Sequence, residues 1–220
     1  CIQSANFSPD SRYIVICSSD ETSTIFAWKD HIWIQETVIQ SESNLWSANF
    51  TPDSCYMITT NRNNTVNFYS RDSTGYWGQK SMIYHDDCTH GINFSSNGKY
   101  ILSIWSEDVV NIRRHNANGQ WVDEMLIYHN DRLNYMSFSP DDRHVLTAGE
   151  DNIVKVHGRN QQDQWIEKII IHNPQKIVSI CFSPDGAHFV ISSHDNTAKI
   201  YSCNVNAEWE EKVIIHHENW

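Results

Sequence analysis

The chain has 220 residues, of which 40% are hydrophobic, with only five Pro and eight Gly, a composition typical of a folded globular protein. No apolar run is long enough to cross a bilayer and no signal-peptide pattern opens the chain, so we expect no membrane association. The formal net charge of −11 at pH 7 argues against nucleic acid as a partner, because affinity for phosphates depends on Lys and Arg. The six cysteines include no C-x-x-C pair, which favours free thiols and a reducing, cytoplasmic compartment. Strand positions such as Cys17 and Cys181 suit small buried hydrophobes.

A five-fold internal repeat organises the chain. The tryptophans that define it stand 44 residues apart, at Trp33, Trp77, Trp121, Trp165 and Trp209. Each of them opens an apolar run, and the first four are followed 17 residues later by a Phe, the first at Phe50. A fixed period of this length is typical of an array of equal supersecondary units. We therefore expect a single domain of five units, at about residues 1–43, 44–87, 88–131, 132–175 and 176–220.

Each unit contains four strand signals in the same order. The first run ends at a Phe and is followed by a turn such as Ser8-Pro9-Asp10-Ser11, where Pro presets φ and Asp bonds its own backbone. A second run, a polar turn, a short third run and a polar loop lead to the Trp run. No segment has a 3.6-residue apolar period, so we expect no helix. Four antiparallel strands repeated at one period predict the blades of an all-β propeller.

The order of strand, Phe-Ser-Pro-Asp turn, strand and Asp-Asn-Thr-x-Lys resembles the WD-repeat family of β-propellers. The best matches are residues 182–186 with 195–201, and residues 138–141 with Asp151 and Asn152. The resemblance covers the whole chain and is specific for the fold, but it says little about function, since the family has many unrelated roles. Our interpretation of the chain is a non-catalytic scaffold for protein–protein interaction. Members of the family more often have seven blades and close the ring by exchanging a strand. Because Trp220 falls where a sixth unit would start, we expect a fragment of a longer protein with other domains; a complete five-bladed ring is the alternative.

The chain departs from the family pattern in two ways. The Trp that ends the third strand in the family is replaced by Phe26, Tyr69, Arg113, His157 and Tyr201. The Gly-His pair before the first strand keeps only its His, at His85, His129, His172 and His217. In the family a His, a Ser or Thr, the turn Asp and that Trp form a buried hydrogen-bond chain in each blade. The resemblance therefore implies partial networks, one of His129, Thr147 and Asp151 with His157 as a doubtful fourth member, and one of His172, Asp195 and Tyr201.

The tryptophan series has two interpretations, packing between units or an exposed aromatic binding stripe. A buried Trp hides a large apolar area, and its truncation to Ala costs about 3–5 kcal/mol. A ligand would not require a Trp at the same position of all five units, whereas packing between successive units would. We therefore expect the five tryptophans to lie in buried seams.

Metal binding and catalysis find little support in the sequence. The motif at residues 85–90 contains His, Asp and Cys, but its spacing matches no closed zinc site, and we expect a solvated loop and no bound metal. No G-x-S-x-G or H-E-x-x-H motif is present, and carboxylate pairs such as Glu107-Asp108 fall on turns. We expect no cofactor and no enzymatic activity. The enzymatic alternative is a propeller glycosidase that uses carboxylates in its channel.

Acidic residues gather at one end of the units. In a WD-type blade the loops before the first strand and after the second lie on one face, where twelve acids oppose three bases. The acids are Asp20, Glu21, Glu42, Asp86, Asp87, Glu107, Asp108, Asp131, Glu150, Asp151, Asp195 and Glu218, and the bases are Arg62, Arg132 and Lys176. This face is either a solvated surface of a purely structural repeat or a docking surface for a basic peptide or protein.

For the docking surface we predict eight residues. They are Trp46, Asp87, Asp131, Arg132, Tyr135, Asp151, Lys176 and Asp195. Trp46, Arg132 and Tyr135 are the expected anchors, because Trp, Tyr and Arg dominate the hot spots of protein interfaces.

Overall fold

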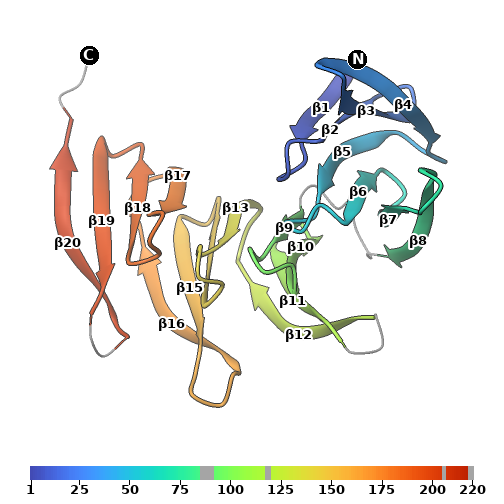
Figure 1. Cartoon of the computed structure of the whole chain (residues 1–220). Coiled ribbons are helices and arrows are strands. Elements are labelled where there is room, and N and C mark those ends of the chain that lie inside the picture. Colours follow the sequence, from blue (N-terminus) through green and yellow to red (C-terminus); the bar gives the residue numbers. More distant parts are fainter. Residues whose placement is uncertain (85–91, 117–119, 205–206, 218–220) are drawn as a thin grey trace. The chain divides into compact units, whose positions relative to one another are not determined.

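A computed structural model describes residues 1–84, 92–116, 120–204 and 207–217, apart from the side chain of Trp105. These residues form twenty strands and no helix, arranged as five four-stranded antiparallel sheets (Figure 1). The predictions of an all-β chain and of five four-stranded blades are confirmed. A bilayer-spanning helix is accordingly not found in the described segments. Residue contacts divide the chain into two compact units, residues 1–98 with 104–106 (unit 1) and residues 99–103 with 107–220 (unit 2).

Unit 1 contains two complete sheets. Sheet 1 consists of β1 (Ile2–Phe7), β2 (Tyr13–Ser18), β3 (Thr22–Lys29) and β4 (Ile32–Gln40). Sheet 2 consists of β5 (Leu45–Phe50), β6 (Tyr56–Asn61), β7 (Thr65–Arg71) and β8 (Trp77–Tyr84).

The remaining three sheets follow in chain order, and the division between the units passes through the first of them. Sheet 3 consists of β9 (Ile92–Phe94), β10 (Tyr100–Ser106), β11 (Val109–His115) and β12 (Trp121–Tyr128). Sheet 4 consists of β13 (Leu133–Phe138), β14 (His144–Gly149), β15 (Ile153–Arg159) and β16 (Trp165–His172). Sheet 5 consists of β17 (Ile177–Phe182), β18 (His188–Ser193), β19 (Thr197–Cys203) and β20 (Trp209–His216).

The turn after the first strand has the same geometry in every sheet. The fourth residue after the Phe that ends the first strand has a positive φ in every sheet. The φ values are 61° at Ser11, 58° at Ser54, 68° at Gly98, 59° at Asp142 and 71° at Gly186. In sheet 1 the hydroxyl of Ser8 donates to Oδ1 of the turn Asp at 2.6 Å, and that same oxygen accepts the backbone N–H of Arg12 at 3.1 Å. The Pro and Asp of the sequence motif thus build a tight hairpin, and glycine suits the left-handed position.

All five sheets share one irregularity between the third and fourth strands. The pairing register shifts just before the residue that replaces the family's Trp, for example between Ile25 and Phe26 and between Val156 and His157. The same shift occurs in sheets 2, 3 and 5. A β-bulge bends a strand and redirects a side chain. The extra residue lies on the fourth strand, at Glu36 in sheet 1 and at Lys168 in sheet 4, so the bulge redirects that side chain.

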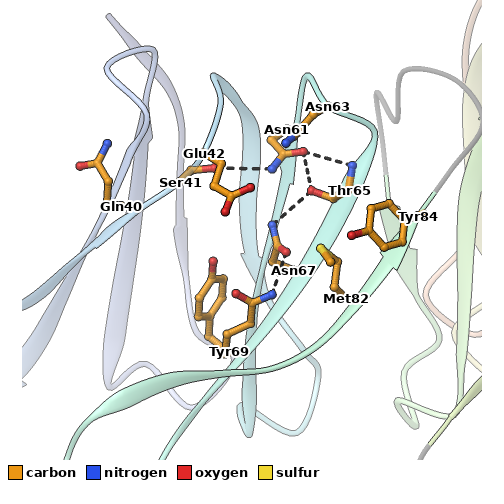
Figure 2. Close-up of a pocket in the computed structure, with 11 residues that line it drawn as sticks. Gln40, Ser41, Glu42, Asn61, Asn63, Thr65, Asn67, Tyr69, Met82 and Tyr84 are labelled. Carbon is orange, nitrogen blue, oxygen red and sulfur yellow. Dashed lines mark hydrogen bonds between the residues drawn. The ribbon is translucent and has the colours of Figure 1, made fainter.

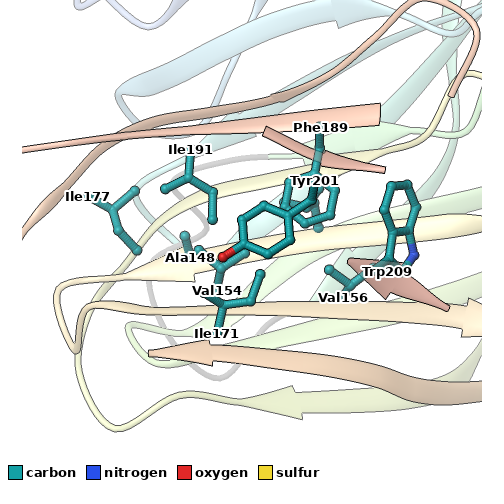
Figure 3. Packing of buried hydrophobic residues seen from close by; sticks show 10 residues of the cluster. Ala148, Val154, Val156, Ile171, Ile177, Phe189, Ile191, Tyr201 and Trp209 are labelled. Carbon is teal, nitrogen blue, oxygen red and sulfur yellow. The ribbon is translucent and has the colours of Figure 1, made fainter. Parts of the chain in front are cut away.

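The apolar core consists of seams between neighbouring sheets within a unit. In unit 1, residues such as Val15, Ile25 and Met57 are buried between sheets 1 and 2. In unit 2, side chains of sheets 4 and 5 form a second cluster that contains Val156 and Phe189 (Figure 3). Alternation along each strand supplies these faces, since successive side chains point to opposite sides of a sheet.

The five described cysteines are free thiols. Cys17 is buried in the seam of unit 1, whereas Cys181 is exposed, so the expectation that Cys181 is buried is wrong. Its neighbours on β17, Ile180 and Phe182, pack against the core of unit 2. Strand alternation therefore turns Cys181 toward the opposite face of sheet 5.

Candidate functional site

Trp77 lies in the seam between sheets 1 and 2. It is 4% exposed and packs edge-on against Tyr13, with ring centroids 5.5 Å apart. Its indole Nε1 donates a hydrogen bond of 3.2 Å to Oε2 of Glu36 on β4, and Nη2 of Arg71 lies 2.7 Å from the other carboxylate oxygen. Burial would raise the pKa of Glu36, but hydrogen bonds from Arg71 and Lys29 outweigh it and hold the pKa below its ordinary value. The seam thus combines an aromatic contact with a hydrogen-bonded group of Trp77, Glu36 and Arg71, which we call the clamp.

The same clamp recurs between sheets 3 and 4 of unit 2. Nε1 of Trp165 donates a 3.1 Å hydrogen bond to Oε2 of Glu124 on β12. The guanidinium of Arg159 lies 4.2 Å from the ring centroid of Tyr100 and 4.9 Å from that of Trp165. Glu124 and Arg159 stand two repeats after the Glu and Arg of the first clamp.

The seam between sheets 4 and 5 lacks this clamp. Trp209 is 5% exposed and packs edge-on against His144 at 5.3 Å, but its Nε1 has no hydrogen-bond partner among the described residues. Lys168 and Cys203 stand where the clamp has Glu and Arg. A lysine ammonium has no lone pair with which to accept the indole N–H.

Trp33 departs from the seam prediction. It is 36% exposed and lies against Phe7 and Trp28, with ring centroids 5.8 Å and 5.1 Å away. Together with Ser11 these rings line a shallow hollow of about 320 Å³. Trp77 and Trp165 each reach the preceding sheet of their own unit, whereas the described ring contacts of Trp33 lie within sheet 1. The prediction of a buried seam is therefore corrected for Trp33, while Trp121 is half-buried.

His129 connects the loop before sheet 4 to the turn of that sheet. Its Nδ1 lies 3.0 Å from Oδ2 of Asp151, and its Nε2 lies 2.9 Å from Oγ1 of Thr147. Burial lowers the pKa of His129, although the charge of Asp151 opposes this. The imidazole is therefore neutral at pH 7, so that Nδ1 donates to the carboxylate and Nε2 accepts from the hydroxyl. His157 is 2% exposed, and its Nδ1 has no hydrogen-bond partner in the described part of the chain.

In sheet 5 the position of this histidine is held by Asn173, which stands 44 residues after His129. Nδ2 of Asn173 donates to Oγ of Ser193 at 2.7 Å. His172 ends β16 and is exposed, so the prediction that it belongs to the network is wrong. In the family a Gly precedes this His, and this chain lacks that Gly. Without it, either His172 or the adjacent Asn173 could be aligned with His129.

The other two residues predicted for the sheet 5 network have different partners. Asp195 accepts the backbone N–H of Thr197 at 3.0 Å and lies 3.9 Å from Nζ of Lys199. The hydroxyl of Tyr201 donates to Oε2 of Glu211 at 2.9 Å. His172, Asp195 and Tyr201 therefore do not form one hydrogen-bond chain.

The predicted acidic face corresponds to one end of each sheet. In an antiparallel meander, the turn between the second and third strands and the connection to the next sheet lie at the same end, which we call the acidic end. Nine of its twelve predicted acids are described, and five of these are exposed: Asp20, Glu42, Glu107, Asp131 and Glu150. Asp151 and Asp195, in contrast, hold the turns of sheets 4 and 5 through the hydrogen bonds described above. The resemblance had placed both carboxylates in hydrogen-bond networks, although both were also predicted for the docking surface.

Two predicted anchors already have partners within the chain. Trp46 is half-buried, with the guanidinium of Arg62 4.9 Å from its ring centroid. The hydroxyl of Tyr135 donates to the backbone carbonyl of Val178, in the seam between sheets 4 and 5. Tyr135 therefore contributes to packing within unit 2, and its role as an anchor stays a prediction.

The charged residues predicted around these anchors are exposed at the acidic end of unit 2. Oδ1 of Asp131 accepts the backbone N–H of Arg132 at 2.7 Å, and both side chains are exposed. Nζ of Lys176 lies 3.3 Å from Oε1 of Glu150, across the junction of sheets 4 and 5.

His85 and Asp87 lie outside the described residues, as does the whole motif at residues 85–90. Their predicted roles in a network, a docking surface or a solvated loop stay predictions. Among the residues that the structure does describe, no group of three or more potential metal-ligating side chains occurs.

A polar cavity of about 480 Å³ opens at the acidic end of unit 1, between sheets 1 and 2 (Figure 2). We call it the amide pocket; its lining residues are Gln40, Ser41, Glu42, Asn61, Asn63, Thr65, Asn67, Tyr69, Gln79, Met82 and Tyr84. A hydrogen-bond relay crosses its floor, from Gln79 to Asn67 at 3.1 Å, from Asn67 to Thr65 at 3.4 Å, and from Thr65 to Asn61 at 2.7 Å.

The sequence did not predict the amide pocket. No motif marks it, and its residues come from the end of one repeat and the second half of the next. The only available signal was a difference from sheet 4, because Ser41 and Asn67 are smaller than His129 and Lys155, which stand two repeats later.

Comparison with known proteins supports the fold assignment. The family model described as WD domain, G-beta repeat, matches residues 124–157 and 166–202, which span β12 to β19. A functionally unknown protein from Desulfotomaculum acetoxidans DSM 771 aligns over 98% of this chain and 70% of its own, with 17% identity and a TM-score of 0.75. Sqt1 from Saccharomyces cerevisiae aligns over 97% of this chain and 62% of its own, with 10% identity and a TM-score of 0.80. At these identities the likeness shows the fold alone.

The sequence matches no curated protein. The repeat of four-stranded sheets, the two segments that match the family model and the shared fold nevertheless agree. Residues 124–157 and 166–202 thus match WD repeats, and the described residues form five four-stranded sheets of the kind found in a WD-repeat β-propeller.

Proposed function

We propose that this chain is a non-catalytic interaction scaffold whose acidic end docks a basic peptide or protein. Proteins of the WD-repeat fold commonly serve as scaffolds for protein–protein interaction. The observation that carries the proposal is the imbalance of exposed charge at the acidic end. At this end of unit 2 the exposed carboxylates are Glu107, Asp131 and Glu150, and the exposed bases are Arg132 and Lys176. At this end of unit 1 Asp20 and Glu42 are exposed, and the base is the Arg62 that covers Trp46.

The location of the cations strengthens this argument. Lys176 is already paired with Glu150, and Arg132 stands next to Asp131. Glu107 and Glu42 have no ion pair among the described residues. Uncompensated charge of one sign attracts a partner of the other sign, which raises the association rate and the selectivity.

Charge reversal tests the proposal. The probe is a fluorescent decalysine peptide, and its dissociation constant is measured by anisotropy at 50 mM and 300 mM salt. We expect Glu107→Lys and Asp131→Lys each to weaken binding several-fold at 50 mM salt, with a smaller effect at 300 mM because of screening. Asp151 is not a suitable target, since its carboxylate holds His129 and the turn of sheet 4.

Glu167→Lys is the matched control, because Glu167 is an exposed residue in the middle of β16 and undergoes the same change of charge. Equal weakening by Glu167→Lys and Glu107→Lys would mean that net charge alone drives binding, and the docking end would then be rejected. A decalysine affinity that none of the three variants changes would reject it as well.

We further propose a cytoplasmic location, on the basis of the free thiols of the described cysteines.

A further inference from the structure

Two lysines of unit 2 occupy equivalent gaps between successive sheets. Lys155 is the third residue of β15, and its Nζ donates a 2.6 Å hydrogen bond to the backbone carbonyl of Tyr128, which ends β12 of the preceding sheet. Lys199 is the third residue of β19, and its Nζ donates to Oδ1 of Asn173 at 2.8 Å. In both sheets an ammonium group therefore fills the space between the third strand and the end of the preceding outer strand.

Unit 1 has the same gap without the ammonium. Asn67 is the third residue of β7, and Gln40 ends β4 as Tyr128 ends β12. A carboxamide is several atoms shorter than a lysine side chain, and Asn67 bonds within its own sheet to Thr65. Ser41 also replaces the imidazole that His129 places in sheet 4. These two reductions in size account for the amide pocket.

The lining of the amide pocket suits a cation. Glu42 supplies a carboxylate that makes no ion pair among the described residues, and the described lining contains no Lys, Arg or His. Burial raises the pKa of Tyr69, and the negative charge of Glu42 acts in the same direction. Glu42 and Tyr69 lie on one side of the cavity and Met82 and Tyr84 on the other, with Asn67 between them (Figure 2).

Each part of an alkylammonium group finds a matching surface here. The carboxylate of Glu42 and the amide oxygens provide acceptors for an –NH₃⁺ group. Aromatic rings attract a cation, and the exposed Met82 and Tyr84 at the rim can cover an aliphatic stem.

We propose that the amide pocket binds the ammonium group of a lysine side chain presented by a partner, in place of the lysine that sheets 4 and 5 carry themselves. This inference rests on the proposed docking of a basic partner at the acidic end, and it names the side chain that would be recognised there.

The test uses the full chain and N-acetyl-lysine amide as the probe, with the Nε-acetylated form of the same compound as the uncharged control. Chemical shifts of the Asn61 and Asn67 side-chain amides are followed by NMR during titration. We expect saturable shifts with the lysine compound and at least tenfold weaker binding of the acetylated form. Glu42→Gln, which alters an exposed side chain, should weaken binding at least fivefold, while Glu21→Gln serves as the matched control at the same end of unit 1.

Asn67→Lys should abolish binding, because an internal ammonium would then occupy the cavity as Lys155 does in sheet 4. Glu42→Gln keeps the test decisive if Asn67→Lys does not fold. Equal shifts with the acetylated compound, equal binding of N-acetyl-arginine amide, or unchanged binding by Glu42→Gln would each overturn the assignment to lysine.

The decalysine assay separates this inference from the proposed function. If Glu107→Lys weakens decalysine binding while the lysine compound causes no shift at Asn61 and Asn67, the scaffold function stands and the pocket inference fails. If Glu107→Lys has no effect as well, both fail.

Discussion

At the scale of single residues, His157 is a source of pH-dependent stability. It is buried on β15, and burial lowers its pKa from 6.5 to about 4. Between these two pH values the unfolded chain binds a proton that the folded chain does not. The free energy of unfolding therefore falls as the pH falls, by about 1.4 kcal/mol per pH unit from this residue.

Replacing His157 with Phe, the residue that sheet 1 carries at the same position as Phe26, should remove this contribution. Urea unfolding at pH 7.0, 6.0 and 5.0 measures the slope for both proteins. His129 and His144 also have pKa values lowered by burial, so a residual slope of the same sign is expected in the variant. Identical slopes for the two proteins would contradict the prediction.

The left-handed residue of the first turn offers a second test at this scale. Ser11 has a φ of 61°, whereas the equivalent turns of sheets 3 and 5 have Gly98 and Gly186 there. A side chain in this conformation costs about 1–2 kcal/mol, partly offset because glycine gives the unfolded chain more freedom. Ser11→Gly should therefore raise the free energy of unfolding by about 0.5–1 kcal/mol in a denaturant titration. Ser11→Ala, which keeps the Cβ, should give no gain, and a gain from both variants would point to the hydroxyl instead.

At the scale of elements, one seam lacks a hydrogen bond that two others have, and substitutions copied from those seams should supply it. Trp77 and Trp165 donate to a Glu on the preceding sheet, whereas the indole N–H of Trp209 faces a seam whose equivalent residue is Lys168. The double change Lys168→Glu and Cys203→Arg copies the clamp into this seam. A satisfied hydrogen bond contributes about 1 kcal/mol, so we expect a gain of that size in the free energy of unfolding.

The reverse change provides the comparison. Glu124→Lys removes the acceptor of Trp165 and leaves its buried N–H unpaired, which costs about 1–3 kcal/mol. Chemical unfolding of both variants measures the two effects. If copying the clamp destabilises the chain while its removal is neutral, the clamp contributes nothing to the seams.

Much of the architecture of these elements could be predicted from the sequence, and the reasons are local. Turns and strand alternation depend on residues that are close together in the sequence. Short patterns are therefore enough to predict the Pro-Asp turns and the twenty strands. The constant spacing of the tryptophans also predicts one sheet per repeat, with the sheets formed in chain order. Trp33 was mispredicted because burial depends on which sheet lies beside it, and a periodic pattern does not contain that information.

The candidate site was less predictable, because its residues act through what lies opposite them. Asp151 and Asp131 were both predicted for the docking surface, yet Asp151 holds His129 and Asp131 is exposed. The amide pocket arises where Ser41 and Asn67 are smaller than His129 and Lys155, their equivalents in sheet 4. Such an absence is visible only when the repeats are superimposed in space.

At the scale of the whole molecule, the repeats make the stability of the chain a sum of contributions from single sheets and from the interfaces between neighbouring sheets. Within a unit, neighbouring sheets bury apolar faces against each other, and unit 1 and unit 2 each have a buried cluster. In arrays of this kind stability depends on the individual repeats and on their nearest-neighbour interfaces. A defect in one seam should therefore weaken its own two sheets first.

Trp77→Ala and Trp209→Ala form a matched pair for testing this locality. Each truncation of a buried Trp should cost about 3–5 kcal/mol, but in different seams. Hydrogen exchange followed by mass spectrometry should show lost protection in β5–β8 and β2–β4 for Trp77→Ala, with β17–β20 unchanged. Trp209→Ala should show the opposite pattern, with loss in β14–β20 and protection retained in β1–β8. Uniform loss of protection in both variants would mean that the sheets unfold as one cooperative body, and the nearest-neighbour description would then be wrong for this chain.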